Sequence, residues 1–274
     1  LAMLTVNYVA GKLGLPCNSM ECTEISTNKY AMRKAFRAAG VPVPGFFEAD
    51  ADTTAEDLKE LKLPVIVKPT DRSGSRGITK VEEWGQLKLA LKDSVDNSFE
   101  KKAIVEEYLT GPEYSCECIS YRGEHHFLAV TKKYTTGEPH FIETGHLEPA
   151  PLTEGQREAI QRAVFAGLDA LKVENGASHT EFKLEGEQVR IIEIGARMGG
   201  DCIGSHLVPL STGQDFVKMV VQTAAGEKPE LNCRPLQKCS AIRFIMDQKD
   251  LETLKHIEEK YPQNVVEKVL EGQP

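Results

Sequence analysis

The chain has 274 residues, 41% of them hydrophobic, which is enough for a substantial core in one large domain or two moderate ones. Its formal net charge of -8 argues against a nucleic-acid scaffold, since neutralising phosphates needs clustered lysine and arginine, and its apolar runs fall short of the ~20 residues that cross a bilayer. No basic region precedes the apolar N-terminus, and the seven cysteines are odd in number and scattered, so we expect a cytoplasmic protein with reduced thiols and neither a membrane nor a nucleic-acid partner.

The first 62 residues predict helices separated by an extended connection. Residues 1–27 run directly into a helical pattern, which suggests a cut fragment or an incomplete leading domain. The letters STN at 26–28 offer N-caps for a helix that ends at Gly40, and VPVPGFFEAD after it indicates extended chain. A further helix is expected over roughly residues 54–62.

Residues 64–109 predict strands around one helix. Strand PVIVKP (64–69) leads into the glycine-rich turn TDRSGSRG, and strand ITKV (78–81) follows it. A helix over 84–95 then precedes strand AIVEEYL at 103–109.

The rest of the chain predicts two hairpins and further helices. Strands 114–121 and 125–134 join at RGE, a long loop follows over 134–151, and a helix spans 154–171. HTEFKL (179–184) and VRIIEIGAR (189–197) form the second hairpin, a helix covers 213–227, and the tail from 233 predicts a strand, a helix and a strand. Because strands and helices mix without regular βαβ alternation, the sequence favours an α+β fold with antiparallel sheets.

The glycine-rich turn is a candidate phosphate site. Gly74 and Gly77 would let backbone N–H groups approach anionic oxygens, although a plain hairpin turn explains the same letters. It is not a Walker A loop, because a β-branched strand rather than a helix follows Gly77. Lys68 strengthens the phosphate interpretation, since a lysine on an apolar strand needs an anion beside it.

Two carboxylates stand twelve residues apart on the second hairpin. If the connection includes Gly186 and has an odd number of residues, Glu181 and Glu193 lie directly opposite; an even connection sends them to opposite faces. Facing carboxylates repel unless a proton or cation lies between them, and Mg²⁺ is the natural occupant. The alternative is two solvated charges on an exposed sheet face.

The stretch IVEEYLTGPEYSCE carries more carboxylates around a tight turn. Glu113 and Glu117 follow the turn at alternating positions that share a face. Such a turn is commonly a sheet edge, but main-chain groups followed by a carboxylate could also hold an adenosine. Cys116 and Cys118 are interpreted as small buried hydrophobic residues rather than a metal or redox pair, because no second pair stands at zinc spacing nearby.

Five motifs stand in order along the chain: NKYAMRKAF, VIVKPTDRSGSRG, IVEEYLTGPEYS, HTEFKL and IIEIGARMGGD. Together they resemble the ATP-grasp superfamily of carboxylate-amine ligases, in its amino-acid-ligase-like or carbamoyl-phosphate-synthase-like branch, over residues 28 to about 228. The resemblance implies two α+β subdomains with antiparallel sheets that grip ATP between them. It divides the chain into the remnant of a preceding domain (1–27), a small subdomain with a linker helix (28–110), a large subdomain with the metal site (111–232) and the start of a C-terminal domain (233–274).

The resemblance also implies roles for individual residues. Arg72 to Gly77 would form a mobile flap over the phosphates, 106–109 would lie beside adenine, and Glu113 at the ribose. Glu181 and Glu193 would bind Mg²⁺, or Mn²⁺ as an alternative. Arg197 and Lys68 would be the catalytic cations. The implied nucleotide-binding residues are Lys29, Lys68, Arg72, Ser73, Gly74, Ser75, Gly77, Glu106, Glu107, Tyr108, Leu109 and Glu113.

One position departs from the family pattern. Many members read E-x-N-x-R, where the asparagine completes the shell of a second metal, but this chain has Gly195 there. The number of metals therefore stays open.

Substrate residues are the least visible in the sequence. Four candidates lie on the motifs above or in the predicted loop 134–151: His146, His179, Gly199 and Gly200. Arg190 and the loop residues Lys132, Lys133 and Glu143 are further candidates, because such a loop commonly lines a substrate pocket.

The resemblance implies a ligase that uses ATP to activate a small carboxylate, such as an amino acid, as an acyl-phosphate for attack by an amine. Two alternatives stay open: a nucleotide-binding regulatory module without turnover, and an enzyme that activates bicarbonate. The resemblance also suggests a homodimer.

Overall fold

The computed structural model describes residues 2–74, 76–138, 142–231, 236 and 238–269. Within these residues the strands form two sheets, and every pair of neighbouring strands is antiparallel. The predicted α+β class with antiparallel sheets is confirmed. No helix in the described ranges has the length and apolar content needed to span a membrane.

The first sheet has four strands in the order β1-β4-β2-β3. They are β1 (Phe46–Ala49), β2 (Val65–Pro69), β3 (Thr79–Val81) and β4 (Ala103–Glu107). Helix α4 (Leu87–Asn97), which follows the 3-10 turn Trp84–Gln86, contacts β2, β3 and β4. Its buried Leu87 and Leu91 join Val65, Val67 and Val105 in one core, while the alternation of β2 leaves Lys68 outside that cluster.

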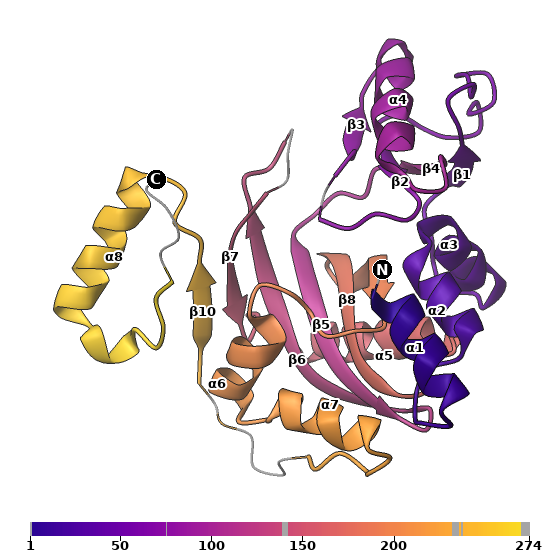
Figure 1. Cartoon of the computed structure of the whole chain (residues 1–274). Coiled ribbons are helices and arrows are strands. Elements are labelled where there is room, and N and C mark those ends of the chain that lie inside the picture. The colour runs from indigo at the N-terminus through magenta and orange to yellow at the C-terminus, as the bar shows by residue number, and fades with distance from the viewer. Residues whose placement is uncertain (1, 75, 139–141, 232–235, 237, 270–274) are drawn as a thin grey trace.

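The second sheet has six strands in the order β10-β7-β6-β5-β8-β9. They are β5 (Glu113–Tyr121), β6 (Glu124–Thr135), β7 (Glu143–Glu148), β8 (Gly176–Glu185), β9 (Gln188–Gly195) and β10 (Ser240–Arg243). In Figure 1 this sheet lies below the four-stranded sheet, with α1 to α3 beside it.

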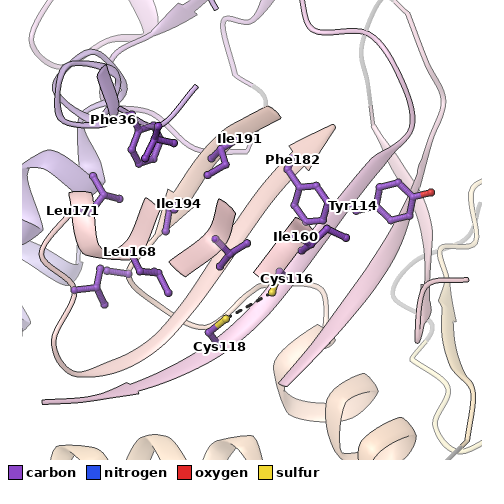
Figure 2. Close-up of a cluster of buried hydrophobic side chains, with 14 of the residues drawn as sticks. Phe36, Tyr114, Cys116, Cys118, Ile160, Leu168, Leu171, Phe182, Ile191 and Ile194 are labelled. Atoms are coloured by element: carbon purple, nitrogen blue, oxygen red, sulfur yellow. Dashed lines mark hydrogen bonds between the residues drawn. The ribbon is translucent and has the colours of Figure 1, made fainter. Parts of the chain in front are cut away.

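Helices cover both faces of the six-stranded sheet. On one face α5 (Glu154–Ala170) packs with the helix α3 (Lys29–Ala38) over the cluster shown in Figure 2, which includes Phe36, Phe182 and Ile194. On the other face lie α7 (Phe216–Ala224), α6 (Val208–Thr212) and the π-helical turn Ile203–Leu207. Cys116 and Cys118 lie in the first cluster with their sulfurs 3.7 Å apart, which confirms their interpretation as buried hydrophobic residues.

Two of the N-terminal helices begin at polar caps. Helices α1 (Ala2–Lys12) and α2 (Met20–Thr27) precede α3, and the Ser19 side chain caps α2. The Asn28 side chain accepts a hydrogen bond from Ala31 N at 3.0 Å and so caps α3, as the STN letters predict. The sequence did not predict α2 as a separate helix. Its last two residues, Ser26 and Thr27, directly precede Asn28.

Three predicted elements are wrong. Residues 54–62 form successive turns, in which Leu58 N donates to Ala55 O and Leu61 N to Leu58 O, instead of an α-helix. The predicted loop 134–151 contains β7, which pairs with β6 and β10. After α8 (Gln248–Lys260) and the turn Pro262–Asn264, the described residues 265–269 form no strand.

Candidate functional site

A pocket lies where the two sheets meet. The four-stranded sheet and the segment after β4 contribute one wall, and β5, β7, β8 and β9 contribute the other. The lining residues are Ile66, Lys68, Ile78, Glu106, Glu107, Tyr108, Leu109, Glu113, Glu143, Glu181, Lys183 and Ile192. Seven of the residues predicted from the sequence to bind nucleotide or metal therefore share one pocket: Lys68, Glu106, Glu107, Tyr108, Leu109, Glu113 and Glu181.

Glu106 forms a buried ion-pair cluster at the small-sheet wall. Its Oε2 lies 2.8 Å from Lys68 Nζ, and its Oε1 accepts from Arg33 Nε. Burial would raise the pKa of Glu106, but the charges of Arg33 and Lys68 outweigh it and hold the pKa at about 2. The carboxylate is therefore ionised at neutral pH. The sequence analysis did not single out Arg33. Its position between the apolar Met32 and Phe36 of α3, both buried, could have indicated that it is buried too.

Lys29, the first residue of α3, connects three segments. Its Nζ donates to Arg72 O at 2.5 Å and lies 3.2 Å from Glu193 Oε2 on β9. The start of α3, the glycine-rich turn and β9 therefore meet at one ammonium group.

The glycine-rich turn connects β2 to β3 and is a hairpin turn as well as a candidate flap. The Arg72 guanidinium lies 4.0 Å from the Phe99 ring centroid. Gly77 has φ of 66, and a Cβ there would lie 3.0 Å from Asn97 Cβ, so this position requires glycine. Ser73 and Gly74 are exposed, and Ser75 lies outside the described residues.

Residues 106–109, the segment predicted to lie beside adenine, have side chains that contact other residues of this chain. Glu107 accepts from Gly45 N at 3.1 Å and from Lys62 N at 3.3 Å. The Tyr108 ring lies 4.9 Å from Lys80 Nζ. Since Glu106 is also paired, the segment would present backbone and apolar surface to a ligand rather than these carboxylates.

Glu181 and Glu193 stand directly opposite each other on β8 and β9, although the connection between the two strands is even. Glu185 pairs with Gln188, so the turn has two residues, and simple alternation would send the carboxylates to opposite faces. A β-bulge leaves Ile192 as an extra residue on β9 and restores the opposition.

Cations surround the two carboxylates. Lys133 Nζ lies 2.6 Å from Glu181 Oε1, and it also lies 3.3 Å from Glu113 and 3.5 Å from Glu143. His179 Nε2 lies 3.3 Å from Glu181 Oε1. Burial would raise the pKa of Glu181, but Lys133 and His179 outweigh it and hold that pKa well below its usual range.

His179 lies between two carboxylates, because its Nδ1 contacts the fully buried Glu117. Burial alone would lower the pKa of His179, but Glu117 and Glu181 raise it to about 10. The imidazole is therefore a cation at neutral pH.

The donor set fits a metal that also uses ligands from a nucleotide. Among the described residues no group of three or more His, Cys, Asp or Glu is arranged to hold a metal ion. Mg²⁺ commonly takes one or two protein carboxylates and completes its octahedron with water and phosphate oxygens. Glu181 and Glu193 supply two such carboxylates on opposed strands.

Four of the predicted substrate residues, His146, His179, Gly199 and Gly200, lie in or beside the loop after β9. His146 is 1% exposed, and its Nε2 lies 3.3 Å from Asp201 Oδ2. A Cβ at Gly199 would lie 2.6 Å from His179 Nδ1, whereas Gly200 has open space. The exposed Arg197 donates from Nη1 to Met198 O at 2.8 Å.

This loop also carries backbone strain. Asp201 and Cys202 have φ of 52 and 58, a region that side chains other than glycine rarely adopt. Strained backbone of this kind is concentrated at functional sites. Sequence reasoning missed Asp201, which stands directly after the glycine pair of the motif MGGD.

Glu148, which sequence reasoning also missed, is fully buried at the end of β7. It accepts hydrogen bonds from Thr131 Oγ1 at 2.7 Å and Ser211 Oγ at 2.6 Å. Burial raises the pKa of Glu148 to about 7, and the two neutral hydroxyl donors offset only part of that effect.

Glu148→Gln is expected to make the protein more stable at pH 8. The folded pKa of about 7 exceeds the ordinary 4.5, so the folded state holds more protons between these values, and this group costs stability as pH rises through that window. The neutral amide should add about 1–3 kcal/mol to the free energy of unfolding at pH 8 and little at pH 4.5, because the hydroxyls can accept as well as donate. Urea unfolding at both pH values measures this, with the exposed Glu158→Gln as control. Equal pH dependence in wild type and Glu148→Gln would contradict it.

The comparisons with known proteins agree with this geometry. A family model described as the ATP-grasp domain matches residues 61–205, which is more than half of the chain. An uncharacterized protein of Sinorhizobium fredii is 31% identical over 253 residues, covering 89% of this chain and 51% of that protein. The alanine–anticapsin ligase of Bacillus subtilis is 32% identical over 217 residues, covering 69% of this chain and 45% of the ligase. The chain thus spans about half the length of these relatives.

A solved structure gives the same picture in three dimensions. The L-amino acid ligase from Bacillus licheniformis superposes with a TM-score of 0.75 at 27% identity, covering 91% of this chain and 63% of that one. The similarity of fold therefore extends over most of the chain.

Proposed function

The chain belongs to the ATP-grasp family, and from this premise we propose that it is an ATP-dependent ligase that activates a small carboxylate as an acyl-phosphate and passes the acyl group to an amine. The observation that carries the proposal is the pair of opposed carboxylates, Glu181 and Glu193, beside the lysines Lys29 and Lys68 at the junction of the two sheets. ADP and phosphate would be the other products.

The proposed nucleotide lies in the pocket between the sheets. Residues 106–109 would border adenine, Glu113 would accept the ribose hydroxyls, and Lys68 would meet the phosphates. The turn from Arg72 to Gly77 would close over the terminal phosphates, where it would exclude water that hydrolyses an acyl-phosphate.

The proposed reaction has two displacements. A carboxylate oxygen of the substrate attacks the γ-phosphorus of ATP and ADP leaves; the amine then attacks the acyl carbon and phosphate leaves with that oxygen. Bound Mg²⁺ would supply charge neutralisation for the phosphates. Lys68 and Arg197 would stabilise the charge that spreads over the transferring oxygens, because this reaction needs positioned cations more than covalent help.

We propose amino acids as substrates. The relatives named above include an alanine–anticapsin ligase and an L-amino acid ligase. At the substrate end of this site His179 and Lys133 are cations, while Glu143 and Asp201 are nearby acidic groups. A zwitterionic amino acid would therefore meet charges of both signs.

We also propose a cytoplasmic setting and a homodimer. The described cysteines are free thiols, which supports the cytoplasmic setting. Light scattering would test the homodimer.

The proposal is tested by incubating the protein and MgATP with amino acids singly and in pairs, while ADP, phosphate and amide products are measured. ADP and amide should form in equal amounts with the correct pair. AMP and pyrophosphate would refute the acyl-phosphate route. ATP-induced stabilisation without ADP under any substrate would instead favour a regulatory module, and ADP release that needs bicarbonate would favour a bicarbonate-activating enzyme.

A further inference from the structure

Arg33 is buried beneath the pocket and touches two other elements. It lies one turn after Lys29 on α3, and only 2% of its surface is exposed. Its Nε contacts Glu106 Oε1 on β4, and its Nη2 donates to Ile192 O on β9 at 2.7 Å. Ile192 is the extra residue of the bulge that brings Glu193 opposite Glu181.

The charges of this cluster do not cancel. Glu106 supplies one negative charge, which it shares between Arg33 on one oxygen and Lys68 on the other. The three side chains are 3%, 2% and 9% exposed, respectively, so water screens their charges poorly. Arg33 Nη1 is buried without a hydrogen-bond partner, so protein acceptors do not use the whole guanidinium. One positive charge therefore remains in surplus within the cluster of Arg33, Glu106 and Lys68.

We propose that Arg33 is a positioning residue that neutralises Glu106 and thereby leaves the charge of Lys68 available to an anionic phosphate group. Without Arg33, Glu106 and Lys68 would form a neutral pair, and a phosphate would have to compete with Glu106 for the lysine. This inference rests on the proposed function, because it assigns a nucleotide phosphate to Lys68.

A purely mechanical role for Arg33 is the competing explanation. Its contacts clamp α3 to β4 and β9, and losing them could loosen the pocket for any ligand. The two explanations differ in one respect: removing the charge of Glu106 as well restores the charge balance but does not restore the clamp.

The experiment compares ADP and adenosine binding by calorimetry in wild type, Arg33→Met, Arg33→Met/Glu106→Gln and Arg33→Lys. Arg33→Met should weaken ADP binding about tenfold or more, because the phosphate must then compete with Glu106 for Lys68 in a site where water screens charges poorly, while adenosine binding changes less than about twofold. The double variant and Arg33→Lys should both recover most of the ADP affinity. Arg37→Met, an exposed position one turn later on α3, is the matched control and should bind ADP like wild type.

Each other outcome counts against the inference. Equal ADP affinity of wild type and Arg33→Met would overturn it, and so would a double variant that stays as weak as Arg33→Met. Equal losses of ADP and adenosine affinity would assign Arg33 the mechanical role. If Arg33→Met fails to fold, the decision passes to Arg33→Lys, where an ADP affinity tenfold below wild type would overturn the inference. Wild type that binds neither ligand would instead refute the proposed function, and this inference with it.

Discussion

Glu193→Gln is expected to lower ADP formation by about 10²–10³-fold, because the proposed metal site loses a charge that would hold the cation near the phosphates. The side chain of Glu193 is 27% exposed and its partner Lys29 is 14% exposed, so the amide should leave the fold intact. Steady-state ADP release at saturating MgATP measures the effect, and thermal unfolding checks the fold.

Glu185→Gln is the matched control for this substitution. Glu185 lies on the same hairpin but is exposed and pairs with Gln188 at the turn. It should keep wild-type turnover. If Glu193→Gln also keeps it, the opposed carboxylates do not form the metal site.

Lys68→Met is expected to reduce turnover by about 10²-fold or more and to weaken ADP binding by about tenfold or more. The substitution leaves Arg33 and Glu106 as a balanced pair, so it removes the surplus positive charge without leaving a buried charge unpaired. The apolar part of the side chain is retained, and the buried wall should stay packed.

Lys102→Met is the control for Lys68→Met. Lys102 lies in the loop before β4, and its partially exposed side chain pairs with Asp50 away from the pocket. It should bind ADP and turn over like wild type. Wild-type ADP affinity in Lys68→Met would show that the nucleotide does not lie against this wall.

The sequence predicted the regular elements best where the pattern is local. The apolar run of VIVKP and the two hairpins are visible in a few consecutive residues, and the structure confirms them. Residues 54–62 have helix-forming letters, but the Asp57 side chain accepts from Thr54 N at 2.8 Å and the backbone forms i to i+3 turns. The strand β7 was hidden because its letters, ETGHLE, are mostly polar and contain no apolar run of the kind that marks β2.

The sequence left the opposition of Glu181 and Glu193 open. It shows that the two residues share a hairpin, and by simple alternation only an odd turn would place them together. The real turn is even, and the bulge at Ile192 makes the difference. A bulge depends on packing against neighbouring elements, here including the Arg33 contact to Ile192 O, and no letter in β9 announces it.

Arg33 and Glu148 were missed for a related reason. Arg33 is 73 residues from its partner Glu106, and Glu148 is 63 residues from its partner Ser211. In the sequence each resembles an ordinary surface residue, because its partner is far away along the chain. Sequence motifs can indicate which residues contact a ligand. The buried charges behind those residues set their protonation states, and these charges are brought into place only by tertiary contacts.

The most direct test of the proposed reaction is to follow oxygen from the carboxylate to phosphate. The protein would be incubated with MgATP, an amine and an amino acid labelled with ¹⁸O in its carboxyl group, and the released phosphate analysed by mass spectrometry. We predict one labelled oxygen in each phosphate, because the oxygen that attacks the γ-phosphorus leaves with it when the amine displaces phosphate. Unlabelled phosphate, or label recovered in AMP, would contradict the acyl-phosphate mechanism.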